Sequence, residues 1–146
     1  MRIYLDNCVY NRLYDNQNDP VIYMEAHAVL EIERRIVNRE VELVSSYVVN
    51  FECSKCPNIE QRRAISDFIA KNASVYVGID KSKEVLEIAK RTMSKGIKLY
   101  DALHVACAVV AECDYFISTD KRLLKCRGEN FKMVNPIVFL MENNDI

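Results

Sequence analysis

Short apolar runs alternate along the chain with longer segments whose apolar residues recur every three or four positions. The short runs predict strands, and the longer segments predict helices. The predicted strands are RIYL (2–5), VELVSS (41–46), SVYVGI (74–79), YFIST (115–119) and KMVN (132–135). This alternation favours an α/β fold with a largely parallel sheet and right-handed crossovers.

Capping residues predict where several helices begin. Asp19 followed by Pro20 is typical of a helix start, and Asn135 followed by Pro136 repeats that signature before the last helix. The remaining helices are predicted at 47–55, at 57–72, from a cap at Asp80 or Ser82 to an end near Gly96, and at 99–113. The helix at 99–113 is apolar nearly all round, as expected of a helix that packs on the sheet and is covered by neighbours.

The length of the chain is that of one ordinary domain, which we expect to span residues 1–146. Half of the residues are hydrophobic and the formal net charge is −1, so neither disorder nor a bulk attraction for nucleic acid is indicated. The start shows no charged-then-apolar signal segment, and the longest apolar stretch, 105–111, is too short to cross a bilayer. We therefore expect a cytoplasmic protein without a membrane partner.

The six cysteines are expected to be reduced. Without a secretory signal, and with a full-sized core available, a disulfide framework is disfavoured. Cys53 and Cys56 form the one tightly spaced pair, and as half of a zinc site it lacks a second pair at the same spacing. Buried free thiols are therefore favoured over a zinc or redox role.

Four acidic residues are predicted at one edge of the sheet. Strands of a parallel sheet run one way and the crossover helices run back, so strand C-termini meet helix N-termini. Asp6 ends the first strand, Asp120 ends YFIST, and Asp101 lies in the first turn of the helix before YFIST. Glu52 lies about one and a half turns into the helix after VELVSS, so it can face the same place. Asp114 precedes its strand and belongs at the opposite edge.

Topology alone leaves two interpretations of this acidic group open. Gathered carboxylates repel one another and raise each other's pKa unless a cation neutralises them, and Mg²⁺ or Mn²⁺ prefers such oxygen ligands. Alternatively, each acid has a local task. Asp101 would complement a helix dipole, Asp120 would cap the next helix, Asp6 would close a turn and Glu52 would face water.

Four segments resemble, in order and spacing, the motifs of PIN-domain nucleases. They are YLDNCVY near the start, SSYVVNFE after the second strand, YDALHVACAV on a helix, and YFISTDKRLL at 115–124. The resemblance covers essentially the whole chain and implies a three-layer α/β/α sandwich with a mainly parallel five-stranded sheet. It carries the acidic quartet of the family onto Asp6, Glu52, Asp101 and Asp120, and a hydroxyl residue of its pattern onto Ser118.

This resemblance implies a metal-dependent nuclease that hydrolyses RNA and leaves 5′-phosphate and 3′-hydroxyl ends. Mg²⁺ or Mn²⁺ would be held by the quartet, with Glu52 completing the coordination or orienting water, and Ser118 is a further catalytic candidate. Single-stranded RNA is expected, because a shallow site admits a flexible strand. Many short members of the family resemble VapC-type toxins, so a small antitoxin and a homodimer formed through the early helices are the implied protein partners.

The chain departs from the family pattern at two positions beside Asp6. A small hydroxyl residue and then Asn or Ser are more usual where Asn7 and Cys8 stand. The resemblance therefore does not carry over the hydrogen bond that such a hydroxyl would make.

Basic residues follow the fourth acid and have two interpretations. Lys121, Arg122, Lys125 and Arg127 could contact RNA phosphates around the cut site, or they could form an ordinary solvated helix face.

Three other residues near the proposed site favour a structural interpretation. His104 could be a general base, but a packed, hydrogen-bonded histidine is favoured because metal-activated water needs no such base. Tyr47 and Tyr100 could stack a splayed base, with packing in the core or at the rim favoured.

Proteins of other classes fit less well. A phosphotransfer receiver domain would need paired acids after the first strand and a lysine after the last, which Asn7 and KMVNP do not supply. A phosphatase of the haloacid-dehalogenase type would need a second Asp where Cys8 stands. The serious rival is a non-catalytic PIN-like module that binds RNA or protein. Such modules usually lack one or more residues of the acidic quartet, whereas this chain has all four.

Overall fold

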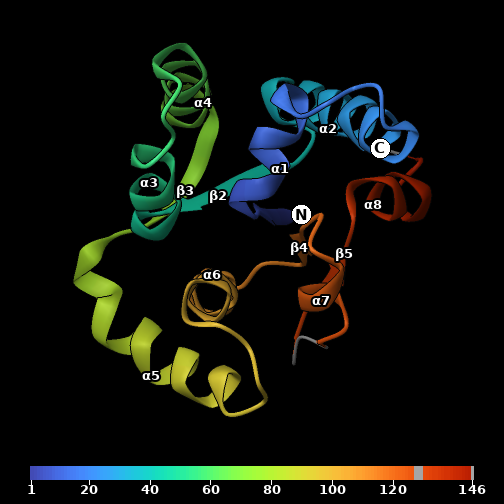
Figure 1. Cartoon of the computed structure of the whole chain (residues 1–146). Coiled ribbons are helices and arrows are strands. Elements are labelled where there is room, and N and C mark those ends of the chain that lie inside the picture. Colours follow the sequence, from blue (N-terminus) through green and yellow to red (C-terminus); the bar gives the residue numbers. More distant parts are fainter. Residues whose placement is uncertain (127–129, 146) are drawn as a thin grey trace.

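A five-stranded parallel sheet forms the centre of the computed structural model, which describes residues 1–126 and 130–145. The strand order is β3-β2-β1-β4-β5 (Figure 1). The strands are β1 (Arg2–Leu5), β2 (Glu42–Ser46), β3 (Ala73–Val77), β4 (Tyr115–Ile117) and β5 (Lys132–Val134). The predicted fold class and all five predicted strands are confirmed.

The first strand lies in the middle of the sheet and anchors the core. Ile3, Tyr4 and Leu5 of β1 are completely buried, because helices cover the sheet on both sides. From β1 the chain first builds the sheet in one direction, to β2 and β3, and then returns to the other side of β1 with β4 and β5. The order of the strands therefore reverses between β1 and β4. Open α/β sheets bind their ligands at such a reversal, beyond the carboxyl ends of the strands.

The helices form a layer on each side of the sheet. In Figure 1, α1, α2 and α8 lie on one side of the strands, and α5 and α6 lie on the other. The α-helices are α1 (Asn7–Asn11), α2 (Pro20–Val37), α3 (Tyr47–Ser54), α4 (Ile59–Asn72), α5 (Ser82–Met93), α6 (Leu99–Val110), α7 (Lys121–Leu124) and α8 (Pro136–Glu142). Two 3₁₀ turns, η1 (Arg12–Tyr14) and η2 (Ile79–Lys81), precede α2 and α5.

Two of the predicted helix caps are confirmed and one prediction is wrong. The Asp19 side chain accepts hydrogen bonds from the first turn of α2, and the Asn135 side chain accepts one from Val138 N at 2.8 Å. At α5 the N-cap is Lys81, without a side-chain hydrogen bond, and neither Asp80 nor Ser82 fills that place. The reason is that η2 runs directly into α5, so Asp80 lies inside the 3₁₀ turn and Ser82 already belongs to the helix.

Two short helices follow the central strands at the carboxyl edge of the sheet. Asp6 N-caps α1 directly after β1, and Asp120 N-caps α7 shortly after β4. With 5 and 4 residues, these helices are shorter than the window over which a helical repeat becomes visible. Both helices begin at the carboxyl edge of the sheet, so their N-cap residues, Asp6 and Asp120, lie at this edge.

All six cysteines are free thiols. Burial raises the pKa of Cys107 to about 11 and that of Cys113 to about 12, so both remain protonated at neutral pH. In the part of the chain that the structure describes, no helix is long and apolar enough to cross a membrane.

Candidate active site

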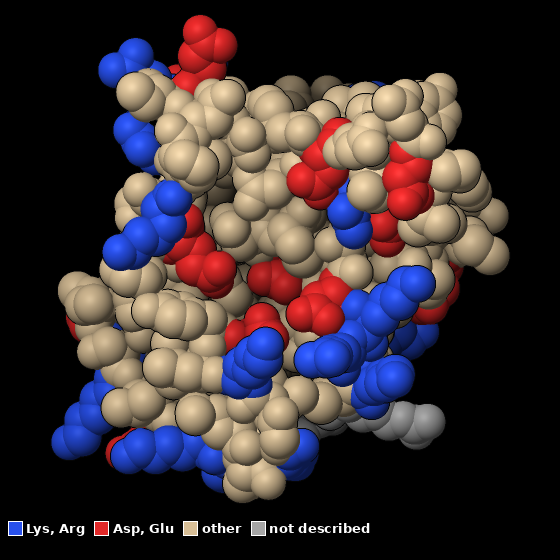
Figure 2. All heavy atoms as spheres, viewed as in Figure 1, with Lys and Arg blue, Asp and Glu red and all other residues tan. Residues whose placement is uncertain are grey.

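The acidic residues of the quartet extend from four different elements toward the carboxyl edge of the sheet. Asp6 follows β1, Asp120 follows β4, and Asp101 lies in the first turn of α6. Glu52 lies on α3, which begins directly after β2. Figure 2 shows acidic side chains grouped in the middle of this face, with basic side chains around them.

Asp114 lies at the opposite edge, as its position before β4 predicts. Its carboxylate accepts a hydrogen bond from Arg2 N at 2.8 Å, where β1 begins. This acid helps to hold the start of the sheet and lies away from the quartet.

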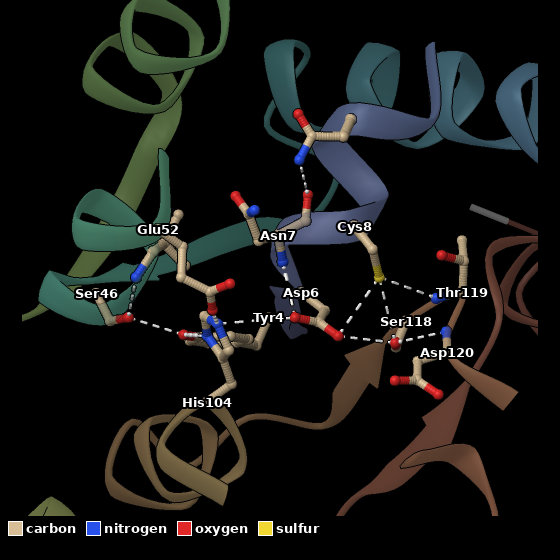
Figure 3. Close-up of polar contacts among 12 residues, drawn as sticks. Tyr4, Asp6, Asn7, Cys8, Ser46, Glu52, His104, Ser118, Thr119 and Asp120 are labelled. Carbon is tan, nitrogen blue, oxygen red and sulfur yellow. Dashed lines mark hydrogen bonds and ion pairs between the residues drawn. The ribbon is translucent and has the colours of Figure 1, made fainter. Parts of the chain in front are cut away.

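Asp6 is held rigidly by hydrogen bonds at both of its carboxylate oxygens (Figure 3). Oδ1 accepts from Asn7 N at 2.8 Å, as the N-cap of α1. Oδ2 accepts from Ser118 Oγ at 2.8 Å and lies 3.5 Å from Cys8 Sγ. These hydrogen bonds give partners to both oxygens of a carboxylate that is almost completely buried.

Ser118 links the two acids that follow neighbouring strands. It is completely buried, donates to Asp6 and accepts from Asp120 N at 3.0 Å. Cys8 Sγ lies 3.5 Å from the same hydroxyl and accepts from Thr119 N at 3.4 Å. Burial, with the nearby Asp6, raises the pKa of Cys8 to about 11, so the thiol keeps the proton that it can donate to Asp6. A cysteine thus contributes hydrogen bonds in a segment that has no hydroxyl at position 7 or 8.

Glu52 is the partly exposed end of a buried chain of hydrogen bonds. Its Oε1 accepts from His104 Nε2, and His104 Nδ1 lies 2.7 Å from the Tyr4 hydroxyl. Tyr4 in turn lies 2.7 Å from Ser46 Oγ, which accepts from Val49 N at 3.2 Å. Tyr4, Ser46 and His104 are completely buried. Every member of this chain of hydrogen bonds has a partner if Ser46 donates to Tyr4, Tyr4 donates to His104 Nδ1, and His104 Nε2–H donates to Glu52.

These hydrogen bonds give His104 a structural role. Both ring nitrogens are engaged and no part of the ring reaches solvent, so the ring is closed to a water or a substrate. The rings of His104 and Tyr4 also pack in a T-shaped arrangement, and the Tyr4 ring stacks on Phe116. The preference for a packed, hydrogen-bonded histidine over a general base is supported.

The four carboxylates influence one another electrostatically. Burial raises the pKa of Asp101 above its ordinary value, and Asp6 and Asp120 raise it further. Glu52 acts in the same direction. Asp101 therefore lies where the negative charge of the other three acids converges.

The chemistry of these donors fits a hard divalent cation. Carboxylate oxygens are the preferred ligands of Mg²⁺ and Mn²⁺, and the convergent charge that raises the pKa of Asp101 is what a cation would neutralise. Within residues 1–126 and 130–145, no three His, Cys, Asp or Glu side chains are grouped closely enough to hold a metal ion as they stand.

The candidate nucleic-acid residues lie beside this group. Lys121, Arg122 and Lys125 are exposed on and just after α7, whose N-cap is Asp120. Arg127, the last basic residue of this run, lies outside the described residues.

The aromatic residues near the site differ in their exposure. Tyr47 is partly buried against the hydrophobic core, so packing is its role. Tyr100 is about half exposed and stacks on Phe51. Sequence reasoning missed Phe51, although its place directly before Glu52 on a helix is the signal that could have found it.

The chain is similar to known proteins in sequence pattern and in fold. A family model described as PIN domain matches residues 3–129. VapBC2 from Rickettsia felis, bound to a DNA fragment from their promoter, shares 17% identity at a TM-score of 0.58, over 92% of this chain and 98% of that chain. FitAcB from Neisseria gonorrhoeae shares 13% identity at a TM-score of 0.55, over 92% and 98%.

A third solved structure, FitAB bound to an IR36 DNA fragment, shares 15% identity at a TM-score of 0.57, over 92% of this chain and 94% of that chain. At these identities the likeness establishes the fold alone. No curated protein matches the chain.

Removing the Tyr4 hydroxyl tests the buried chain of hydrogen bonds. Tyr4→Phe should lower the free energy of unfolding by about 1–3 kcal/mol, because Ser46 Oγ and His104 Nδ1 lose their shared partner away from water. Urea denaturation followed by circular dichroism measures this loss. Tyr115→Phe is the matched control, since its hydroxyl donates to the partly exposed Glu142 and water can replace it. Equal losses in both variants would contradict the role given to the buried chain.

Proposed function

The chain belongs to the PIN domain family, and we propose that it is a divalent-metal-dependent endoribonuclease. The observation that carries this proposal is the convergence of four carboxylates where the strand order reverses. Membership of this family supports a nuclease activity. The metal, the RNA substrate and the site residues are our proposal.

We propose that Asp6, Glu52, Asp101 and Asp120 hold Mg²⁺ or Mn²⁺. When bound, such an ion would polarise a phosphodiester oxygen and lower the pKa of an attacking water. The chain itself supplies the fixed charges that select a divalent cation and the hydrogen bonds that keep those charges in place.

Each acid contributes in a different way. Asp6 cannot turn, because both of its oxygens are hydrogen-bonded, so it serves as the fixed point of the site. Asp120 Oδ1 accepts from the backbone of Arg122 at 2.9 Å and Leu123 at 3.3 Å, which directs its other oxygen away from the helix cap. Glu52 gives Oε1 to His104 and keeps Oε2 for a ligand or a water. Ser118 is a positioning residue, because it is buried and acts through Asp6 and Asp120.

The substrate class follows from the shape and charge of this face. The carboxylates repel a phosphate unless a cation and basic side chains compensate, and Lys121, Arg122 and Lys125 are the nearby exposed candidates. A single strand can follow a shallow site, whereas the deep major groove of duplex RNA presents no bases to it. We therefore propose cleavage of single-stranded RNA to 5′-phosphate and 3′-hydroxyl products, in the cytoplasm.

A homodimer is proposed because α2 and α8 leave an apolar groove uncovered. The groove has a volume of about 450 Å³ and is lined by Tyr23, Met24 and Met141 among others. Met24 is 57% exposed and Met141 71%. A second copy placed on the same surface would cover both grooves by two-fold symmetry and join two sites into one longer RNA surface. A small antitoxin, as in VapC-type toxins, is the other proposed protein partner.

Metal binding is the first test of the site. Calorimetry should show that Mn²⁺ binds the wild type and fails to bind a double variant with Asp6→Asn and Asp101→Asn, because two of the four charges are lost. The matched control combines Asp67→Asn and Asp114→Asn, which removes two acids away from the quartet. Equal Mn²⁺ binding by all three proteins would remove the quartet as a metal site.

Cleavage of RNA tests the activity itself. Wild-type protein with Mg²⁺ or Mn²⁺ should cut a mixed pool of structured RNAs in unpaired regions, EDTA should stop the reaction, and sequencing of new 5′ ends should locate the cuts. Asp101→Asn should abolish cleavage while the protein stays folded. Cleavage that persists in this variant would indicate a contaminating nuclease, and a wild type that cuts nothing would favour the non-catalytic binding module.

Salt dependence separates the basic residues from the metal site. Lys121→Ala combined with Arg122→Ala should weaken RNA binding and flatten its dependence on salt, because fewer counterions are released. Mn²⁺ binding should stay unchanged in this variant. The matched control removes two exposed lysines of α5, with Lys83→Ala and Lys90→Ala. If both double variants change the salt dependence of RNA binding equally, the basic residues of α7 make no specific contribution to binding.

Oligomeric state tests the apolar groove. Light scattering should report a dimer for the wild type and a monomer for Met24→Asp, since a carboxylate in the groove would be buried without a partner. Ile79→Asp is the control, because Ile79 is 71% exposed on η2, outside the groove. A wild-type monomer at micromolar concentration would reject the dimer.

A further inference from the structure

Two half-exposed aromatic rings stack on each other beside the proposed catalytic acids. Phe51 of α3 and Tyr100 of α6 have ring centroids 5.8 Å apart and planes inclined by only 9°. Phe51 is 44% exposed and Tyr100 is 45% exposed. These two rings, the aromatic pair, form a flat apolar surface that is open to solvent.

The position of the aromatic pair connects it to the acidic quartet. Each ring directly precedes an acid of the quartet, Glu52 or Asp101, on the same helix. The helices α3 and α6 are also joined by the hydrogen bond from His104 to Glu52. Tyr100 lies one turn before His104, at the N-terminal end of α6. The aromatic pair therefore lies at the outer rim of the contact between α3 and α6.

Positive charge accompanies the aromatic pair. Lys55 Nζ lies 4.9 Å from the centroid of the Phe51 ring. This cation follows directly after α3, as its C-cap, whereas Lys121 and Arg122 belong to α7, which follows β4. The acidic group therefore has positive charge beside it from two separate elements, and in Figure 2 basic side chains flank the acids on more than one side.

We propose that the aromatic pair stacks an unpaired base of the RNA strand next to the cleaved phosphate, with Lys55 near the backbone of that nucleotide. This inference rests on the proposed nuclease function and specifies how its substrate is held. A nucleobase matches a flat, open aromatic surface with a cation beside it, because every base has a π-face and every nucleotide carries a phosphate. Bases inside a duplex are already stacked and cannot reach such a surface, so the pair selects single strands.

Removing the base and removing the ring, separately and together, test the stacking. A fluorescent single-stranded RNA is titrated with wild-type protein in Ca²⁺, and the titration is repeated with RNAs that carry one abasic nucleotide at each position in turn. Wild type should lose affinity roughly ten-fold at one or two positions. Tyr100→Ala should bind the intact RNA roughly ten-fold more weakly and should no longer respond to the abasic nucleotide at those positions.

Two further variants isolate the role of the ring. Tyr100→Phe should bind like the wild type, because it keeps the stacking surface. Tyr14→Ala should also bind like the wild type, because Tyr14 is 48% exposed on η1 and belongs to neither helix of the pair. Thermal melting confirms that each variant is folded, and the abasic series on the wild type alone decides the question if Tyr100→Ala does not fold.

The outcomes separate this inference from the proposed function. If wild type cuts RNA with Mg²⁺ but responds to no abasic position, the stacking proposal is wrong and the nuclease stands. The same follows if Tyr100→Ala binds like Tyr14→Ala, or if it remains as sensitive to the abasic nucleotide as the wild type. If wild type neither binds nor cuts any RNA, the proposed function fails and the stacking proposal fails with it.

Discussion

Hydrogen bonding on both sides of β1 determines where the acidic residues can lie. Tyr4 is in register with Val44 of β2 and with Phe116 of β4, and beyond the strand Asp6 N donates to Ile117 O at 2.9 Å. This register brings the ends of β1 and β4 level, so Ser118 reaches Asp6. A slip of one residue would turn β1 over and move Asp6 to the other face of the sheet. The pairing of short apolar strands thus fixes a polar site that lies beyond them.

The carboxylates are kept close by polar contacts that extend into the core. Asp6 has donors at both oxygens, and Glu52 is joined through His104 to Tyr4. Buried polar groups are costly without partners, so each contact in this network depends on the others being made. The negative charge of Asp101 is not compensated in this arrangement, because burial and its acidic neighbours raise its pKa. The fold supplies hydrogen bonds that hold Asp6 and Glu52 in place, whereas burial and the acidic neighbours disfavour the charged form of Asp101.

The sequence predicted the sheet and the edge at which the acids gather, because both follow from periodicity and from the direction of parallel strands. Asp6 and Asp120 could be placed because each follows a strand closely. The contact between Tyr4 and His104 joins residues 100 positions apart and leaves no local pattern, so the buried chain could not be predicted. The same holds for the stacking of Phe51 on Tyr100. The cap of α5 was predicted wrongly because a 3₁₀ turn before a helix changes which residue occupies the cap.

The buried chain through Tyr4, Ser46 and His104 also limits how the sequence can change over evolutionary time. A substitution at one member leaves a donor or an acceptor of another without a partner, so single changes there are disfavoured even where each new residue would fit by size. A relative that has lost the histidine can escape this penalty by losing the tyrosine hydroxyl as well. In related sequences these three positions should therefore vary together, as one inherited unit, although they lie on three separate segments of the chain.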